Sequence, residues 1–97
     1  MLTRQDIVTR LSELKPELQR DFSVTGIGVF GSFADNSQTL YSDIDLVVEF
    51  AHPIGWKYFT LEKYLEGIFG RKVDIVTKAA LKEQIKDQIL QATIFIE

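Results

Sequence analysis

The chain has 97 residues, of which 45% are hydrophobic and 26% charged, so it has the composition of one folded globular domain spanning residues 1–97. The absence of cysteine excludes disulfides and thiolate metal sites and fits a reducing cytoplasm. A net charge of −3 disfavours nucleic acid as the main partner, and no apolar run has the length of a membrane span.

The N-terminal segment predicts two consecutive helical pieces. Thr3 followed by Asp6 has the spacing of a helix-capping pair, and apolar residues then recur at helical spacing. These features predict a helix from about Thr3 to Leu14. Pro16 disfavours helical backbone at Lys15 but is acceptable in a first turn. We therefore expect a break there and a second short helix from Pro16 to about Asp21.

A predicted strand from Val24 to Phe30 leads into a glycine-serine turn. Gly31 permits a tight turn of the backbone, and the small Ser32 is expected to open a short helix ending near Ala34. Free N–H groups at the start of a helix favour an anion, and a hydroxyl adds a further donor. Gly31 and Ser32 are therefore candidates for holding phosphate.

Two aspartates alternate with aliphatic residues at the start of a second predicted strand, about Asp43 to Phe50. Because strand side chains alternate between faces, Asp43 and Asp45 point the same way, with Cα atoms about 6.5 Å apart. Two such carboxylates among aliphatic side chains are disfavoured unless a cation compensates, and their oxygen ligands suit Mg²⁺. The apolar run that follows Asp45 predicts a covered central strand.

A helix is expected from Trp56 to about Phe69, with an apolar face that includes Phe59, Leu61, Leu65 and Ile68. Its aromatic residues are more typical of a core than of a base-stacking platform. His52, in the loop before this helix, is expected at the surface rather than in a metal or general-base site.

The last third of the chain predicts a third strand and a final helix. The strand runs from Arg71 to Thr77 and places Asp74 among aliphatic residues. The helix runs from Lys78 to about Gln91, and the apolar tail after it either pairs as an edge strand or meets a partner. We expect an α/β (α+β) domain with a mixed, twisted sheet of three to four strands and helices mainly on one face.

Gly31-Ser32, ten further residues and then Asp43-x-Asp45 resemble the signature of the DNA polymerase beta type nucleotidyltransferase superfamily. The short length and the segment 70–77, which carries Asp74, resemble in particular the minimal nucleotidyltransferases. These are antitoxin-like partners of HEPN-domain proteins. The resemblance runs from about Ile7 to Leu90, nearly the whole chain.

This resemblance implies a nucleotidyltransferase core and a set of residue roles. Asp43, Asp45 and Asp74 would be the catalytic residues and would hold two Mg²⁺ ions, about 3.5–4 Å apart in sites of this kind. Gly31 and Ser32 would hold the β and γ phosphates of the substrate ATP. The chain has no room for an acceptor-binding domain, so the implied partner is a HEPN-domain protein inactivated by AMP transfer, commonly on a tyrosine.

One position departs from the family pattern and leaves two alternatives open. Relatives usually continue Gly-Ser-x-Ala with Arg-Gly, whereas Ala34 here precedes Asp35 and Asn36. An anion in place of this cation would weaken nucleotide binding by about one to three orders of magnitude. The first alternative is a degenerate nucleotidyltransferase fold that neutralises its partner by contact alone, in a hetero-oligomer. The second is a metal-binding regulatory domain that takes no nucleotide. A homo-oligomer is equally compatible with the sequence.

Overall fold

The computed structural model describes all residues, 1–97, and contains three α-helices and a four-stranded sheet. The helices are α1 (Arg4–Phe22), α2 (Lys57–Phe69) and α3 (Glu83–Ala92), and the strands are β1 (Val24–Phe30), β2 (Ile44–Phe50), β3 (Val73–Thr77) and β4 (Ile94–Phe95). Two 3₁₀ turns, Gly31–Phe33 and Lys78–Ala80, follow β1 and β3. The predicted fold class is confirmed. No helix has the length and apolarity needed to cross a membrane.

The sheet has the strand order β3-β2-β1-β4. β1 runs antiparallel to both β2 and β4, whereas β2 and β3 are parallel, so the sheet is mixed as predicted. β2 lies between β1 and β3, which confirms its predicted central position in the sheet. The C-terminal tail pairs with β1 through Ile94 and Phe95, and this confirms the edge-strand alternative.

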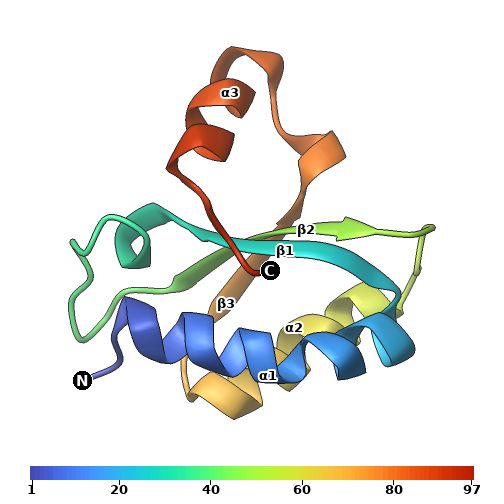
Figure 1. Cartoon of the computed structure of the whole chain (residues 1–97), viewed down its shortest axis with the longest axis horizontal. Helices are drawn as coiled ribbons and strands as arrows, with labels where there is room; N and C mark the ends of the chain where they lie inside the picture. Colours follow the sequence, from blue (N-terminus) through green and yellow to red (C-terminus); the bar gives the residue numbers. More distant parts are fainter.

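The hydrophobic core lies between one face of the sheet and the helices α1 and α2 (Figure 1). Leu46 and Val48 of β2 point into this core and are fully buried. Val47 is also buried but lies outside the core cluster, on the opposite face. The helix α3 stands over that opposite face and contributes no buried residue (Figure 1). Helices therefore cover mainly one face, and the other face is thinly covered.

The N-terminal helix is continuous, and the predicted break at Lys15 and Pro16 is wrong. The capping pair is present as expected, because the Asp6 amide donates to Thr3 Oγ1 at 3.1 Å and the Thr3 amide to Asp6 Oδ2 at 2.9 Å. Pro16 lies inside the helix with an exposed ring. Buried apolar residues recur on both sides of it and continue through Leu18 and Phe22. Burial of this stripe against the sheet offsets the lost backbone hydrogen bond.

The apolar face of α2 agrees with the prediction except at Phe59. Leu61 and Leu65 are fully buried as expected and Ile68 packs against the core, but Phe59 is 56% exposed. At 100° per residue, Phe59 projects away from the side that carries both leucines, while Tyr58 projects towards them. Tyr58 packs against the core and donates its hydroxyl to the carbonyl oxygen of Ile75.

A stripe of polar side chains on α2 caps the outer edge of β3. Glu66 Oε2 accepts from the Val73 amide at 3.1 Å, and Glu62 Oε2 accepts from the Ile75 amide at 3.4 Å. Together with Tyr58, these residues repeat every four positions and so face the strand along one side of the helix. The stripe satisfies backbone groups that an edge strand would otherwise leave unpaired.

The final helix is shorter than predicted and is not buried. The segment expected to begin it, Lys78–Ala80, forms a 3₁₀ turn, and α3 starts only at Glu83. Ile85 in this helix is 43% exposed. The tail beyond the helix is better anchored, because Ile96 is buried in the core and its carbonyl accepts from Lys15 Nζ at 3.0 Å.

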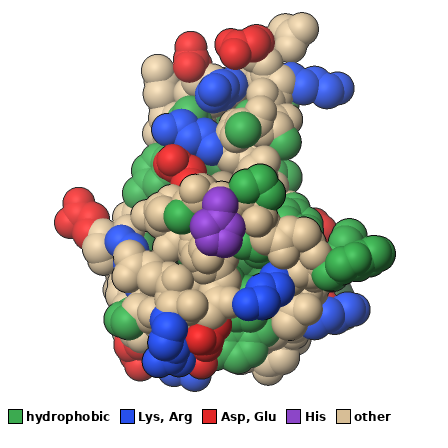
Figure 2. All heavy atoms as spheres, turned by 90° about the vertical axis from the view of Figure 1, so that its right-hand side faces the viewer, with side chains coloured by type: hydrophobic (Ala, Val, Ile, Leu, Met, Phe, Trp, Pro, Cys, Tyr) green, Lys and Arg blue, Asp and Glu red, His purple; other side chains and the backbone are tan.

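The connection between β2 and α2 lies at the end of the molecule that faces the viewer in Figure 2. His52, the one histidine of the chain, is exposed there as expected. Its ring nitrogens lie 3.2 Å from Ser23 Oγ and 3.1 Å from the carbonyl oxygen of Pro53. These contacts hold the loop and involve no carboxylate.

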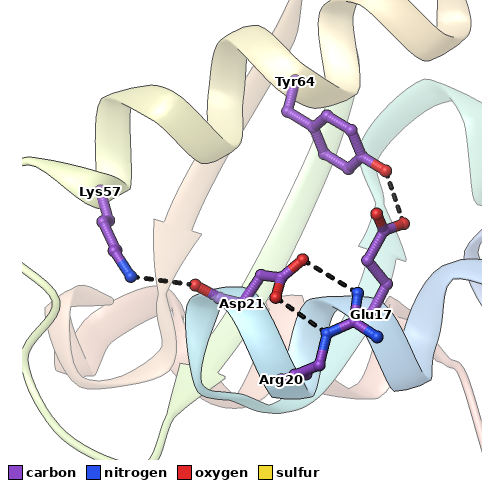
Figure 3. A network of polar contacts seen from close by, with 5 residues as sticks. All are labelled: Glu17, Arg20, Asp21, Lys57 and Tyr64. Atoms are coloured by element: carbon purple, nitrogen blue, oxygen red, sulfur yellow. Dashed lines mark hydrogen bonds and ion pairs between the residues drawn. The ribbon is translucent and has the colours of Figure 1, made fainter.

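Polar contacts also tie α1 to α2 at their exposed sides (Figure 3). The Tyr64 hydroxyl donates to Glu17 Oε2 at 2.6 Å, and Lys57 Nζ donates to the carbonyl oxygen of Asp21 at 3.3 Å. Arg20 pairs with Asp21 at 2.9 Å. The contacts of Tyr64 and Lys57 therefore link the two core-covering helices to each other.

Candidate functional site

Two of the three predicted aspartates lie on the sheet face that is not covered by α1 and α2. Asp45 and Asp74 are direct neighbours in the parallel register of β2 and β3, and paired residues of neighbouring strands share a face. Asp45 alternates with the core residues Ile44 and Leu46, which places Asp45 and Asp74 on the side of the sheet that α3 overlooks. Asp43 lies just before β2, near enough for its charge to act on Asp45.

The carboxylates perturb one another electrostatically. Burial raises the pKa of Asp45 above its ordinary value, and the negative charges of Asp74 and Asp43 raise it further. Asp74 is 47% exposed, and its Oδ1 lies 3.8 Å from Lys72 Nζ. Lys72 is therefore the resident counter-ion of a cluster that carries excess negative charge.

The glycine-serine turn packs directly against this cluster. Phe30, the last residue of β1, pairs with Asp45 across the sheet, and the chain then turns at Gly31 with φ +72°. A Cβ atom at position 31 would overlap Asp45 Oδ2. Glycine is thus required for two reasons: the left-handed backbone and the close approach to the carboxylate. The sequence indicated only the first.

The short helix predicted after this turn is a single 3₁₀ turn. The Gly31 carbonyl accepts from the amides of Ala34 at 3.0 Å and Asp35 at 3.3 Å. The chain then leaves helical geometry at Asn36, which has φ 62°. So short a turn has little macrodipole, and that part of the predicted phosphate affinity is corrected. The local donors of the turn and the Ser32 hydroxyl remain.

Asp35, the residue that departs from the family pattern, is bound within its own loop. Its Oδ1 accepts from the Ser37 amide at 2.9 Å, and hydrogen bonds with Ser37 hold the pKa of Asp35 below its usual range. The carboxylate is exposed and forms no ion pair. It is consequently ionised at neutral pH and screened by solvent.

The donor chemistry of the cluster suits a hard divalent cation, although the side chains do not yet converge on one. No three acidic or histidine side chains are arranged to hold a metal ion. A cation between the carboxylates would nevertheless relieve the repulsion that raises the pKa of Asp45, and carboxylate oxygens are the ligands that Mg²⁺ prefers.

The structure has two hollows, and one of them borders the glycine-serine turn. This hollow, of about 370 Å³, opens between the turn and α3, with Gly31 and Asp35 on one side and Ile85 and Gln88 on the other. The other, of about 490 Å³, lies at the far end of the sheet beside His52 and contains none of the predicted site residues. Of the predicted site residues, Gly31 alone lines a hollow.

Sequence reasoning gave no role to two basic residues of this region, Arg71 and Lys72. Arg71 Nη1 donates to the carbonyl oxygens of Thr39 and Ser42, and Lys72 pairs with Asp74. Both were visible only as a short basic run. Their proximity to the acidic motif in the fold could have been found from the parallel pairing of the two aspartate strands.

Comparisons with known proteins agree with this geometry. Residues 11–96 match the nucleotidyltransferase domain family. The protein adenylyltransferase MntA of Thermococcus cleftensis is 38% identical over 97 residues, covering 99% of this chain and 98% of the relative. A structure provisionally described as a minimal nucleotidyltransferase shares 29% identity, with TM-score 0.79, over 96% of this chain and 95% of its own. The fold also matches a toxin-antitoxin crystal structure with AMP-PNP, at TM-score 0.70 and 23% identity, covering 87% and 70%.

Proposed function

Since the chain belongs to the nucleotidyltransferase family, we propose that it transfers AMP from ATP to a hydroxyl group on a partner protein. The observation that carries this proposal is the meeting of Asp45, Asp74 and Gly31. Carboxylates from two parallel strands lie beside a glycine-serine turn on one face of the sheet. The name protein adenylyltransferase, borne by the relative MntA, supports AMP as the group transferred.

The partner is a HEPN-domain toxin, and the modification inactivates it. Support comes from the resemblance to minimal nucleotidyltransferases and from the toxin-antitoxin structure that shares this fold. The small size of the domain is consistent with an acceptor that is delivered by another protein, because the sheet face bearing the aspartates is covered only by α3.

In the reaction, the acceptor oxygen bonds to the α-phosphorus of ATP while the bond from that phosphorus to the leaving pyrophosphate breaks. Asp43, Asp45 and Asp74 would hold Mg²⁺, which would stabilise charge on the attacking and leaving oxygens. Asp74, whose side chain is 47% exposed, would accept the hydroxyl proton. Gly31 and Ser32 would bind the terminal phosphates.

Incubation with radiolabelled ATP, Mg²⁺ and the HEPN-domain partner tests this proposal. Label should appear on the partner with native protein and fall by about a hundredfold or more with Asp43→Asn plus Asp45→Asn. Asp87→Asn, an exposed aspartate of α3, is the matched control and should retain transfer.

The same assay separates the contact-only alternative, which Asp35 favours because it stands where relatives carry arginine. In that case native protein would bind the partner and neutralise it without labelling it, and the double variant would neutralise it equally well. Calorimetry with ATP and Mg²⁺ would show no binding. Neutralisation without labelling, or the absence of ATP binding in calorimetry, would overturn the proposed transfer activity.

A further inference from the structure

The segment between the glycine-serine turn and Asp43 joins the two halves of the site but has little structure of its own. After the 3₁₀ turn it contains no helix or strand before β2. Its side chains are largely exposed, with Leu40 at 64% and Tyr41 at 92%. Apolar burial fixes the segment only at its start, where Phe33 and Ala34 are buried, so other contacts must hold the rest in place.

A single side chain contacts the segment near both of those ends. Arg71 Nη1 donates to the carbonyl oxygens of Thr39 and Ser42, each at 3.1 Å. The guanidinium carbon also lies 5.3 Å from the ring centroid of the fully buried Phe33. Ser42 immediately precedes Asp43, and Phe33 immediately follows Ser32. Arg71 thus contacts Phe33, which adjoins the Gly31-Ser32 turn, and Ser42, which adjoins Asp43.

Arg71 also connects the segment to the strand that bears the third carboxylate. Arg71 lies two residues before Val73, where β3 begins, and three residues before Asp74. No carboxylate pairs with Arg71, whereas its neighbour Lys72 pairs with Asp74. Its guanidinium is therefore committed to backbone carbonyls and an aromatic ring, contacts that a planar fork of donors makes better than an ammonium group.

We propose that Arg71 is a positioning residue of this site: it holds the segment 33–42 so that Asp43 and the Gly31-Ser32 turn keep their places beside Asp45 and Asp74. This inference rests on the proposed nucleotidyl transfer. It assigns Arg71 no contact with substrate, and its loss should lower turnover by displacing groups that do make that contact.

Kinetics of Arg71→Gln and Arg71→Lys test the inference, with Arg10→Gln as the matched control because Arg10 makes only an exposed ion pair with Glu13. We expect kcat for AMP transfer to fall about 10- to 100-fold in Arg71→Gln, with KM for ATP changed by less than about fivefold. Arg71→Lys should recover part of the loss. Native kcat in folded Arg71→Gln, or a change confined to KM, would overturn the proposal.

Amide hydrogen exchange provides a readout that does not depend on transfer. The amides of Thr39, Tyr41 and Ser42 are hydrogen-bonded within the segment. Their exchange should accelerate about tenfold or more in Arg71→Gln, while amides of β2 stay unchanged. Unchanged exchange of the segment would refute the positioning role even if turnover fell. If the native protein transfers no AMP, the proposed function fails, and exchange still decides whether Arg71 holds the segment.

Discussion

At the residue scale, Asp45 carries a cost to stability that its proposed role requires. Its folded-state pKa is raised, so the ionised form is less favourable in the folded chain than in the unfolded chain. The resulting destabilisation is fully present above the folded pKa and disappears as the pH falls below the unfolded value. Active sites commonly show this opposition between function and stability.

Asp45→Asn should therefore raise the melting temperature at pH 7, by about 2–4 °C, while abolishing AMP transfer. The gain should shrink as the pH is lowered through the folded pKa of Asp45, because the native carboxyl is then protonated. Thermal unfolding of both proteins at several pH values measures this difference. A variant that is less stable than native protein at pH 7 would contradict the assignment.

Gly31→Ala should be destabilising for reasons of space and backbone strain. The added Cβ would overlap Asp45 Oδ2, and φ +72° is unfavourable for alanine. We expect a loss of about 1–3 kcal/mol in the free energy of unfolding, measured by urea denaturation, together with reduced transfer. Gly67→Ala is the control: its Cβ would meet nothing within 4 Å inside α2, so stability should stay level or rise by about 0.5–1 kcal/mol.

Lys72 competes with a divalent cation for the same carboxylate. Lys72 Nζ lies 3.8 Å from Asp74 Oδ1, so removing its charge should make the cluster more attractive to Mg²⁺. We expect Lys72→Gln to bind Mg²⁺ alone about 3- to 10-fold more tightly by calorimetry. Lys63→Gln, which removes an exposed partner of Glu66, should leave Mg²⁺ affinity unchanged. Weaker binding in Lys72→Gln would show that the ammonium does not compete.

At the scale of elements, α2 fixes β3 through side-chain hydrogen bonds as well as through packing. Glu66→Ala leaves the part-buried Val73 amide without its acceptor and should cost about 1–2 kcal/mol of unfolding free energy. Glu66→Gln retains an acceptor oxygen and should cost less than half as much. Chemical denaturation of the two variants provides the comparison. Equal losses would indicate that the charge of Glu66, not the hydrogen bond, matters at this edge.

Periodicity was sufficient for the elements in which one pattern dominates. β1 and β2 lie where alternation and turn residues placed them, to within one residue, and the register that sets Asp45 beside Asp74 follows from their position at the start of parallel strands. The predicted break at Pro16 was wrong because a local preference is weaker than continuous burial of the α1 stripe. For α2, the prediction placed Phe59 with Leu61 and Leu65, although the helical repeat directs Phe59 to another side and Tyr58 towards the leucines, where Tyr58 packs against the core.

The contacts of Arg71 were beyond prediction for a different reason. They join a side chain to backbone carbonyls of an irregular segment, and carbonyls have no sequence signature. The same holds for the Asp35 hydrogen bond to Ser37, which depends on the loop conformation. Residue types therefore indicated which side chains belong to the candidate site. The contacts that hold the surrounding loop, such as those of Arg71, became visible only in the fold. The catalytic and metal-binding roles of Asp43, Asp45 and Asp74 stay predictions.

At the scale of the whole molecule, stability and proposed function lie on opposite faces of the sheet. α1 and α2 bury the core on one face, whereas α3 covers the aspartate face without burying any residue. Amides of α3 should consequently exchange at least about a hundredfold faster than those of α1, because α3 can open without exposing the core. Ile96 follows α3 but is buried, so Ile96→Ala should cost about 2–4 kcal/mol while Ile85→Ala costs little. Equal protection of α1 and α3 would mean that the two faces unfold as one unit, and access to the aspartates would then require global opening or a path around α3.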